Sequence, residues 1–287
     1  MLIDKVNHHI QHPLLKENRV RKGYYPSEAS AIDKRTGKCL GKCLRAAYYS
    51  WSGEEKTNPP DARGEWTFAF GHGIEAMYTE YFKQLGIWAG NNVKFYDVVR
   101  NISGESDIFV FDDNNEVQGV EIKTAYGYGF QKNVKTAPKP ENLMQVGIYL
   151  DNFLFTKYYI LIYHARDTHE QVEYKVSRHE IDGKHHLMIN DVIPVTNWSM
   201  EDVYERYNLL GQALMTKIMP PNDFTYCYTK EESAQRFANG EISKTKWAKV
   251  EKDTEFDSDW QCLYCPYLDK CWAKKRGEMK LKFGGIK

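Results

Sequence analysis

Two short apolar segments on either side of a turn-prone run constrain this chain more than any other feature. The segments SDIFVF and VQGVEIKT are rich in β-branched and aromatic residues, and Asp112-Asp113-Asn114-Asn115 stands between them. Such residues favour strands, and Asp and Asn favour tight turns, so the sequence predicts an antiparallel hairpin. If the hairpin is centred on Asn114, Asp107 lies directly opposite Glu121, with Cβ atoms about 4.5–5.5 Å apart.

The predicted hairpin gathers charged side chains on one face. Lys123 follows Glu121 by two residues and shares the face of Glu121 and Asp107, because side chains alternate along a strand. Opposed carboxylates repel each other unless a cation lies between them or the surface is solvated. Carboxylate oxygens suit Mg²⁺ or Mn²⁺, which polarise a phosphate and acidify bound water, and a lysine can orient that water. An exposed hairpin with alternating charges is the alternative. The residues expected to pack on the core from the other face are Ile108, Val110, Val120 and Ile122.

The remaining segments predict an α/β core with a helical, metal-bound flank. A short helix is expected in GKCLRAAYYSW, a strand in NVKFYDVV, a helix in ENLMQVGIYLDNFL, and two strands in KYYILIYHA and EQVEYKVSR. Residues 178–192 and 199–218 are predicted to be helices. An amphipathic helix is predicted over residues 66–88, with an apolar stripe through Trp66, Phe70, Ile74, Met77, Tyr81 and Leu85.

The six cysteines indicate metal or redox chemistry, because the chain has no mark of secretion. Cys262, Cys265 and Cys271 are close enough in sequence for one metal site, but they supply only three thiolates. Zinc accepts three Cys with a fourth Cys or His, and iron–sulfur clusters are held by four Cys. Reduced, partly buried thiols are the alternative. Cys227 fits no pattern and is expected to be an ordinary core or loop thiol.

Four short motifs together resemble those of the PD-(D/E)XK nuclease superfamily, in its RecB-like branch. Each motif is weak alone, but the four follow the family's order, and together with the cysteines described next the resemblance extends from about residue 27 to residue 272. It implies a restriction-endonuclease-like core with a mixed central sheet flanked by helices. The motifs are Gly71 to Glu75 for Gly-x-x-x-(His or Glu), Gly104 to Asp107 for Gly-x-x-Asp, Glu121 to Lys123 for Glu-x-Lys, and Gln145 to Tyr149 for Gln-x-x-x-Tyr.

The resemblance also implies roles for individual residues. Glu75, Asp107 and Glu121 would bind Mg²⁺ or Mn²⁺ together with the main-chain carbonyl of Ile122, and Lys123 would serve the water or the phosphate. Gln145 and Tyr149 would contact DNA or support the active centre. Many relatives have His where this chain has Glu75, which changes the ligand charge. His72 is nearby, but it does not stand at the ligand position of the motif, so it is not expected to bind metal.

A second resemblance concerns the cysteines. The stretch from Cys43 through Arg45 to Tyr49 is similar to the Cys-x-Arg-x-x-Tyr-Tyr opening of iron–sulfur RecB-like nucleases, which include the CRISPR-associated exonuclease family and the nuclease domain of AddB. It implies a structural 4Fe–4S cluster that clasps the chain ends across the nuclease core. Cys39 competes for the first position, but the Arg and Tyr-Tyr follow Cys43 at the family spacing. The implied ligands are Cys43, Cys262, Cys265 and Cys271.

Charge and hydropathy constrain the function of the chain less than the motifs do. With 39 basic and 39 acidic residues, only local patches could attract DNA. Lys38, Lys42 and Arg45 form one candidate, and the tail around Lys274-Lys275-Arg276 with Lys280 and Lys282 forms another; a solvated face and a frayed terminus are the alternatives. No apolar run is long enough to cross a membrane, and no secretory signal is visible. We therefore expect a cytoplasmic protein of a bacterial, archaeal or phage-infected cell.

The sequence thus predicts one integrated domain with three parts: an N-terminal segment over 1–60, a nuclease core over 61–220 and a cluster-binding region over 221–287. The predicted activity is that of a Mg²⁺- or Mn²⁺-dependent deoxyribonuclease, an exonuclease on single-stranded DNA or DNA ends, with endonuclease activity left open. Expected partners are DNA and proteins of recombination, replication or CRISPR adaptation. A non-catalytic DNA-binding or adaptor protein is one alternative, although the intact Asp107, Glu121 and Lys123 argue against it. An iron–sulfur electron carrier or redox sensor is another, but it leaves the carboxylates without a role.

Overall fold

The computed structural model describes residues 2–11, 22–192 and 196–284. The chain divides into two compact units. The first unit comprises Met1–Lys42 and Asp61–Gln212, and the second comprises Cys43–Pro60 and Ala213–Lys287. Among the described residues, no helix combines the length and the apolar composition that crossing a membrane requires.

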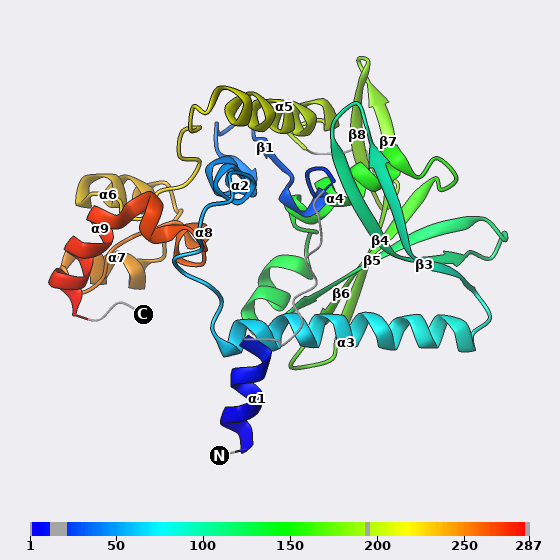
Figure 1. Cartoon of the computed structure of the whole chain (residues 1–287), viewed down its shortest axis with the longest axis horizontal. Coiled ribbons are helices and arrows are strands. Elements are labelled where there is room, and N and C mark those ends of the chain that lie inside the picture. The colour runs from blue at the N-terminus through cyan, green and yellow to red at the C-terminus, as the bar shows by residue number, and fades with distance from the viewer. Residues whose placement is uncertain (1, 12–21, 193–195, 285–287) are drawn as a thin grey trace. The chain divides into compact units, whose positions relative to one another are not determined.

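The first unit is built around a six-stranded sheet in which the strands follow the order of the sequence (Figure 1). β5 and β6 are parallel, and every other neighbouring pair is antiparallel. The predicted α/β architecture with a mixed sheet is therefore confirmed. The strands are β3 (Trp88–Asp97), β4 (Ile102–Phe111), β5 (Val117–Ala125), β6 (Tyr158–Ala165), β7 (Gln171–Ile181) and β8 (Lys184–Ile189).

The parallel pair exists because a helix connects its strands. Parallel neighbours need a crossover, and α4 (Pro140–Asn152) supplies it between β5 and β6. Pro140 begins the helix, where a missing N–H costs nothing, and the residues from Leu143 to Leu150 are all buried. This burial makes α4 a rigid support for any side chain that it presents to β5.

The hairpin between β4 and β5 forms in the predicted register. Ile108 pairs with Val120 and Phe111 with Val117, and the turn between them is held by Asp112 Oδ1, which accepts from the backbone N–H groups of Asn114 and Glu116 at 2.9 and 2.8 Å. The apolar residues predicted for the core face, Ile108, Val110, Val120 and Ile122, are all buried in one cluster.

That cluster is covered by α3 (Ala62–Gln84), whose start is capped by Asp61 accepting from the Gly64 N–H. The predicted helix is confirmed, but most of its predicted buried stripe is wrong. Trp66, Phe70, Tyr81 and Leu85 are exposed, and the residues that face the sheet are Ile74, Met77, Tyr78 and Phe82. Both sets recur at three- and four-residue steps, so periodicity alone could not choose between them.

Residues 178–192, predicted to be a helix, instead form the end of β7 and all of β8. Asp182 and Gly183 join the strands with φ of 50° and 71°, the geometry of a two-residue hairpin turn. An Asp-Gly pair is a strong hairpin signal, and it outweighs the helical appearance of the flanking residues.

The first unit also contains shorter elements. A parallel β-bridge pairs Tyr24 with Ile102, so the segment after residue 21 runs beside β4. The predicted helix over 199–218 is confirmed as α5, which begins in this unit. The elements are α1 (Leu2–Gln11), the 3-10 helix η1 (Pro26–Glu28), β1 (Ser30–Ile32), β2 (Cys39–Gly41), the π-helix η2 (Gly129–Val134) and α5 (Met200–Thr216).

The second unit is helical in its described part. Segments far apart in sequence meet in it, since the backbone N–H groups of Thr57 and Asn58 both donate to the Pro266 carbonyl at 2.8 and 2.9 Å. Thr229 and Glu232 cap α6 reciprocally. The short helix predicted near Cys43 is confirmed as α2. The helices are α2 (Leu44–Trp51), α6 (Lys230–Ala238), α7 (Lys244–Glu251), α8 (Trp260–Leu263) and α9 (Leu268–Phe283).

Candidate functional site

The predicted catalytic residues lie where the β4–β5 pairing ends. The ladder stops at Ile108 and Val120, so Asp107 and Glu121 are the next residues beyond it. Each strand continues to pair with its other neighbour, since Ser106 pairs with Val93 and Glu121 with Leu161. The two carboxylates thus face each other from strands that are each held in place. We call Glu75, Asp107, Glu121 and Lys123 the acidic cluster.

Glu121 is the most constrained member of the acidic cluster, with a side chain that is 0% exposed. Its Oε1 accepts from Lys123 Nζ at 2.5 Å and from Gln145 Nε2 at 2.9 Å. Its Oε2 is buried and accepts no hydrogen bond from the described residues. A buried carboxylate oxygen without a donor is costly, and a cation bound there would remove that cost.

Gln145 and Tyr149 form a chain of hydrogen bonds behind Glu121. Gln145 Nε2 also donates to Tyr149 Oη at 2.9 Å, and Tyr149 Oη donates to the Glu105 carbonyl at 3.0 Å. Both side chains are buried, and burial raises the pKa of Tyr149 so that it stays a donor. The four-residue spacing of Gln145 and Tyr149 on α4 places them on one helix face, and that face holds Glu121.

The electrostatics of the acidic cluster are unfavourable without a cation. Burial, followed by the carboxylates of Glu121 and Glu75, raises the pKa of Asp107 to about 9. Burial and Glu121 likewise raise the pKa of Glu75. Burial opposes the charge of Lys123, but Glu121 and Asp107 raise its pKa and keep it an ammonium. With one lysine beside three carboxyl groups, Asp107 is therefore protonated at neutral pH unless a cation is bound.

The other residues predicted for the metal site make fewer contacts with the acidic cluster. Glu75 comes from α3, and His72 Nδ1 lies 3.8 Å from Glu75 Oε2, so His72 contacts a cluster member. Ile122 is buried in β5 between Glu121 and Lys123. Over residues 2–11, 22–192 and 196–284, no group of three or more His, Cys, Asp or Glu side chains is already arranged as a set of metal ligands. The oxygen donors and the unpartnered Glu121 Oε2 nevertheless fit a hard divalent ion chemically.

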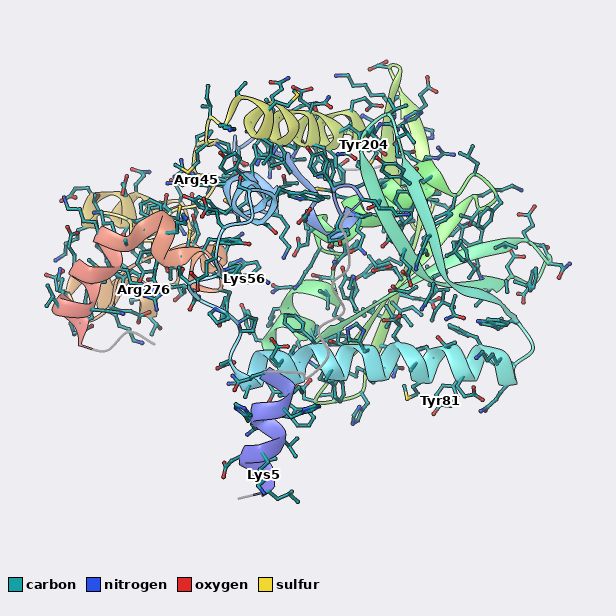
Figure 2. The ribbon with its side chains drawn as sticks, viewed as in Figure 1. Lys5, Arg45, Lys56, Tyr81, Tyr204 and Arg276 are labelled. Atoms are coloured by element: carbon teal, nitrogen blue, oxygen red, sulfur yellow. The ribbon has the colours of Figure 1, made fainter. Side chains whose placement is uncertain are left out.

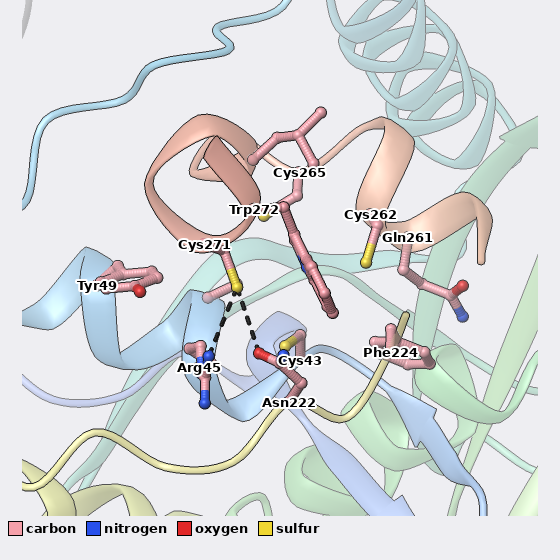
Figure 3. Close-up of a pocket in the computed structure, with 12 residues that line it drawn as sticks. Cys43, Arg45, Tyr49, Asn222, Phe224, Gln261, Cys262, Cys265, Cys271 and Trp272 are labelled. Carbon is pink, nitrogen blue, oxygen red and sulfur yellow. Dashed lines mark hydrogen bonds between the residues drawn. The ribbon is translucent and has the colours of Figure 1, made fainter. Parts of the chain in front are cut away.

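The second unit brings together all four cysteines of the predicted cluster. They line one pocket with Arg45, Asn222 and Trp272, and we call it the cysteine pocket (Figure 3). Cys271 Sγ lies 3.3 Å from Asn222 Oδ1 and 3.8 Å from Arg45 Nη1. Arg45 Nε donates to the Pro220 carbonyl at 2.7 Å, so its guanidinium is held inside this unit. The four cysteines are Cys43, Cys262, Cys265 and Cys271.

The other two cysteines lie elsewhere. Cys39 belongs to β2 in the first unit, where its Sγ is 3.8 Å from Arg206 Nη2. Cys227 Sγ lies 3.6 Å from Met279 Sδ and does not line the pocket. None of the six cysteines, all of which lie in the described part of the chain, forms a disulfide. Of the two candidates for the first position, the structure therefore places Cys43 beside the late cysteines.

The donor atoms of the cysteine pocket suit a metal group, but the volume of the pocket is too small to hold one in this conformation. Burial, followed by the neighbouring thiols, raises the pKa of Cys262, so thiolates there require a cation. The pocket holds only ≈ 20 Å³, and the indole of Trp272 lies among the cysteines (Figure 3). Trp272, near the start of α9, has φ of −132°, so the helix is kinked at the residue whose indole occupies the pocket.

Comparison with known proteins gives two distant structural likenesses. No family model matches the chain, and no curated protein matches its sequence. The crystal structure of SSO0001 is similar over 93% of this chain and 94% of its own, with 15% identity and a TM-score of 0.46. An alkaline exonuclease, LHK-Exo from Laribacter hongkongensis, is similar over 69% of this chain and 84% of its own, with 13% identity and a TM-score of 0.39. At these values neither likeness assigns a family or a function.

Two residues of these sites were missed from the sequence. Glu105 supplies the carbonyl that anchors Tyr149, and its charge contributes to the raised pKa of Glu75. Its position two residues before Asp107 could have drawn attention to it. Asn222 contacts Cys271, but nothing in its local sequence indicates this, because the contact joins residues 49 positions apart.

Proposed function

We propose that this chain is a metal-dependent nuclease that hydrolyses phosphodiester bonds in DNA. The observation that carries the proposal is the buried Glu121, whose Oε2 accepts no hydrogen bond from the described residues while Lys123 and Gln145 hold its Oε1 and Asp107 lies close enough for the two carboxyl groups to interact. A structural ion pair has no need for the additional acidic residues Asp107 and Glu75. A centre that must accept a cation and a phosphate together needs both the carboxylates and the lysine.

In this proposal Glu75, Asp107 and Glu121 hold Mg²⁺ or Mn²⁺ with the Ile122 carbonyl. When bound, the ion polarises the phosphate and lowers the pKa of its water. Lys123 neutralises charge that develops on the phosphate, because its ammonium already lies at the edge of the cluster with 29% of its side chain exposed. The hydrogen bond from Gln145 fixes the orientation of the Glu121 carboxylate, and the hydrogen bond between Gln145 and Tyr149 fixes the orientation of Gln145.

The finer parts of the proposal follow from the motif resemblance. We propose an exonuclease that acts on single-stranded DNA or DNA ends, in the cytoplasm, alongside proteins of recombination, replication or CRISPR adaptation. We also propose that Cys43, Cys262, Cys265 and Cys271 hold a structural 4Fe–4S cluster. Four thiols lining one pocket support a four-thiolate group. Arg45 supports this region by contacting Cys271.

The test of the activity is digestion of labelled single- and double-stranded DNA with Mn²⁺ or Mg²⁺. We expect cleavage by the wild type, none in EDTA, and a loss of about 10²–10³-fold in Lys123→Ala. Lys157→Ala is the matched control, because Lys157 also pairs with a carboxylate, that of Glu116 in the β4–β5 turn, but is 75% exposed. Equal activity in Lys123→Ala, or DNA binding without cleavage under every metal, would contradict the proposal and favour a non-catalytic DNA-binding role.

The cluster has its own test. Anaerobically purified protein should show broad visible absorbance and contain about four irons per chain, the number in the proposed cluster. A colourless protein that contains stoichiometric zinc would show that the four cysteines hold zinc and not an iron–sulfur cluster. A protein with neither metal would show that the thiols are ordinary.

A further inference from the structure

A groove in the first unit has no place in the chemistry described so far. Its volume is ≈ 940 Å³, near the upper limit for small-molecule pockets. Lys22 and Tyr25 come from the segment before η1, and Lys94 and Tyr96 come from β3. The two walls are fixed to the sheet, because the Tyr24 N–H donates to the Asn101 carbonyl at 2.7 Å and the Ser103 N–H donates to the Tyr24 carbonyl at 2.9 Å.

The groove adjoins the acidic cluster. Gln145 and Tyr149 line it, and Gln145 Nε2 is the atom that donates to Glu121 Oε1 at 2.9 Å. Glu105 also lines it, and the charge of Glu105 acts on Glu75. A molecule lying in the groove would therefore reach the residues that position the proposed metal ligands.

The charges of the groove suit a flexible polyanion. Lys22 and Lys94 are exposed, and the side chain of Lys94 is 79% exposed. Glu105 would repel a phosphate, but Lys94 Nζ lies 3.9 Å from its Oε2 and offsets part of that charge. An exposed pair at this distance is weak, so the Lys94 ammonium is available to a stronger anion.

The aromatic residues select among polyanions. Tyr25, Phe95 and Tyr96 line the groove, and Tyr96 is 46% exposed. Gly104 lets the Phe95 ring lie flush with β4, because a Cβ there would come within 2.6 Å of the ring. Proteins that bind single strands combine a basic groove with aromatic rings on which bases stack. Bases within a duplex are covered by their neighbours and cannot use such rings.

We propose that this groove binds the single-stranded part of the nucleic acid substrate, with phosphates at Lys22 and Lys94 and an unpaired base on Tyr96. The proposal rests on the proposed function, since it supplies the path by which a strand reaches the acidic cluster. It assigns strand selection to residues outside the cluster, so binding and cleavage can be separated by experiment.

The first measurement is fluorescence anisotropy of a labelled oligothymidylate and of a blunt duplex, in EDTA and over a series of salt concentrations. We expect tighter binding of the single strand. Lys22→Ala and Lys94→Ala should each reduce the slope of log affinity against log salt by about 0.7, the loss of one phosphate contact to a single strand. Lys157→Ala, which removes a lysine outside the groove, should leave the slope unchanged.

The second measurement addresses stacking. Tyr96→Ala should weaken single-strand binding about tenfold, and Tyr96→Phe should retain it because the ring remains. Tyr81→Ala is the matched control, since Tyr81 is 51% exposed on α3 and does not line the groove (Figure 2). A wild type that prefers the duplex, or unchanged binding in both Lys variants and in Tyr96→Ala, would overturn the proposal.

The two proposals fail separately. If Lys123→Ala is inactive but the groove variants bind like the wild type, the nuclease proposal stands and the groove proposal falls. If Lys123→Ala cleaves as well as the wild type, the catalytic assignment falls, whereas the anisotropy in EDTA still decides the groove.

Discussion

The acidic cluster and the cysteine pocket hold their donor atoms in different ways. Glu121 is fixed by a strand, a buried helix and hydrogen bonds of 2.5 and 2.9 Å, all of which belong to the core of the first unit. The thiols come from the start of α2, from the four-residue α8 and the turn after it, and from the first turn of α9, and the contacts of Cys271 are 3.3 and 3.8 Å. In the acidic cluster the fold therefore fixes the positions of the donor atoms, whereas in the cysteine pocket few contacts fix the positions of the thiols.

This difference indicates what each bound group would contribute. In the acidic cluster the buried Glu121 Oε2 has no donor among the described residues, and the crowded carboxyl groups cost stability, so an ion bound there would serve chemistry and relieve repulsion. The cysteine pocket contains Trp272 and holds only ≈ 20 Å³, so a group there would reorganise the second unit and contribute to its folding. The contrast can be tested by removing one donor from each.

The largest effect is expected from Asp107→Asn. The change removes one proposed ligand, and activity should fall about 10³-fold. It also removes a buried carboxyl group that must take up a proton beside Glu121 and Glu75, so the unfolding midpoint in EDTA at neutral pH should rise by roughly 2–4 °C, equivalent to about 1 kcal/mol. Activity assays and thermal unfolding of one preparation measure both.

Asp113→Asn is the control for that experiment, because Asp113 lies in the exposed turn of the same hairpin. It should leave activity and midpoint unchanged. A fall in the midpoint of Asp107→Asn would mean that the acidic cluster stabilises the fold, and the contrast with the cysteine pocket would be lost.

The next effect is expected from Cys262→Ser. Loss of one proposed thiolate ligand should lower bound iron about tenfold or more and lower the unfolding midpoint by roughly 6 °C or more, because metal ligation there would contribute directly to the free energy of folding. Iron analysis, visible absorbance and thermal unfolding measure these changes. Cys227→Ser is matched in chemistry and lies outside the pocket, so it should change neither. An unchanged midpoint in Cys262→Ser would show that the second unit folds without its bound group.

Local patterns predicted the elements whose causes are local. The β4–β5 hairpin, its centre at Asn114 and the helix α4 follow from alternation, turn residues and a proline at the helix start. The same kind of signal was present and overlooked at Asp182-Gly183, where two positive φ angles make a hairpin of a segment predicted to be helical.

Properties that depend on packing could not be predicted in this way. The sequence of α3 allows two apolar stripes, and only the sheet decides that Ile74 and Tyr78 face inward while Trp66 and Tyr81 stay exposed. The burial of Glu121 likewise depends on α4, from which Gln145 reaches its carboxylate. Motif spacing brought Gln145 into consideration, but its hydrogen bond to Glu121 is visible only in three dimensions.

The smallest of these effects is expected from Gln145→Met, which keeps the volume and removes the donor to Glu121 and Tyr149. Gln145 touches no reacting group in our proposal and acts by positioning Glu121. The apparent affinity for Mn²⁺ should therefore fall about 10–100-fold, the range for a residue that orients a metal ligand. At saturating Mn²⁺, kcat should recover to a large extent and KM for DNA should change little.

Titration of activity with Mn²⁺ separates this role from a merely structural one, because a packing defect would lower activity equally at all metal concentrations. Asn152→Ala provides a control on the same helix, since its amide donates to the Ile148 carbonyl and not to the cluster. If Gln145→Met raised KM for DNA and left the metal dependence unchanged, Gln145 would contact the substrate instead. The acidic cluster would then be held by Lys123 and the strands alone, and it would resemble the cysteine pocket more closely than the hydrogen bonds of α4 suggest.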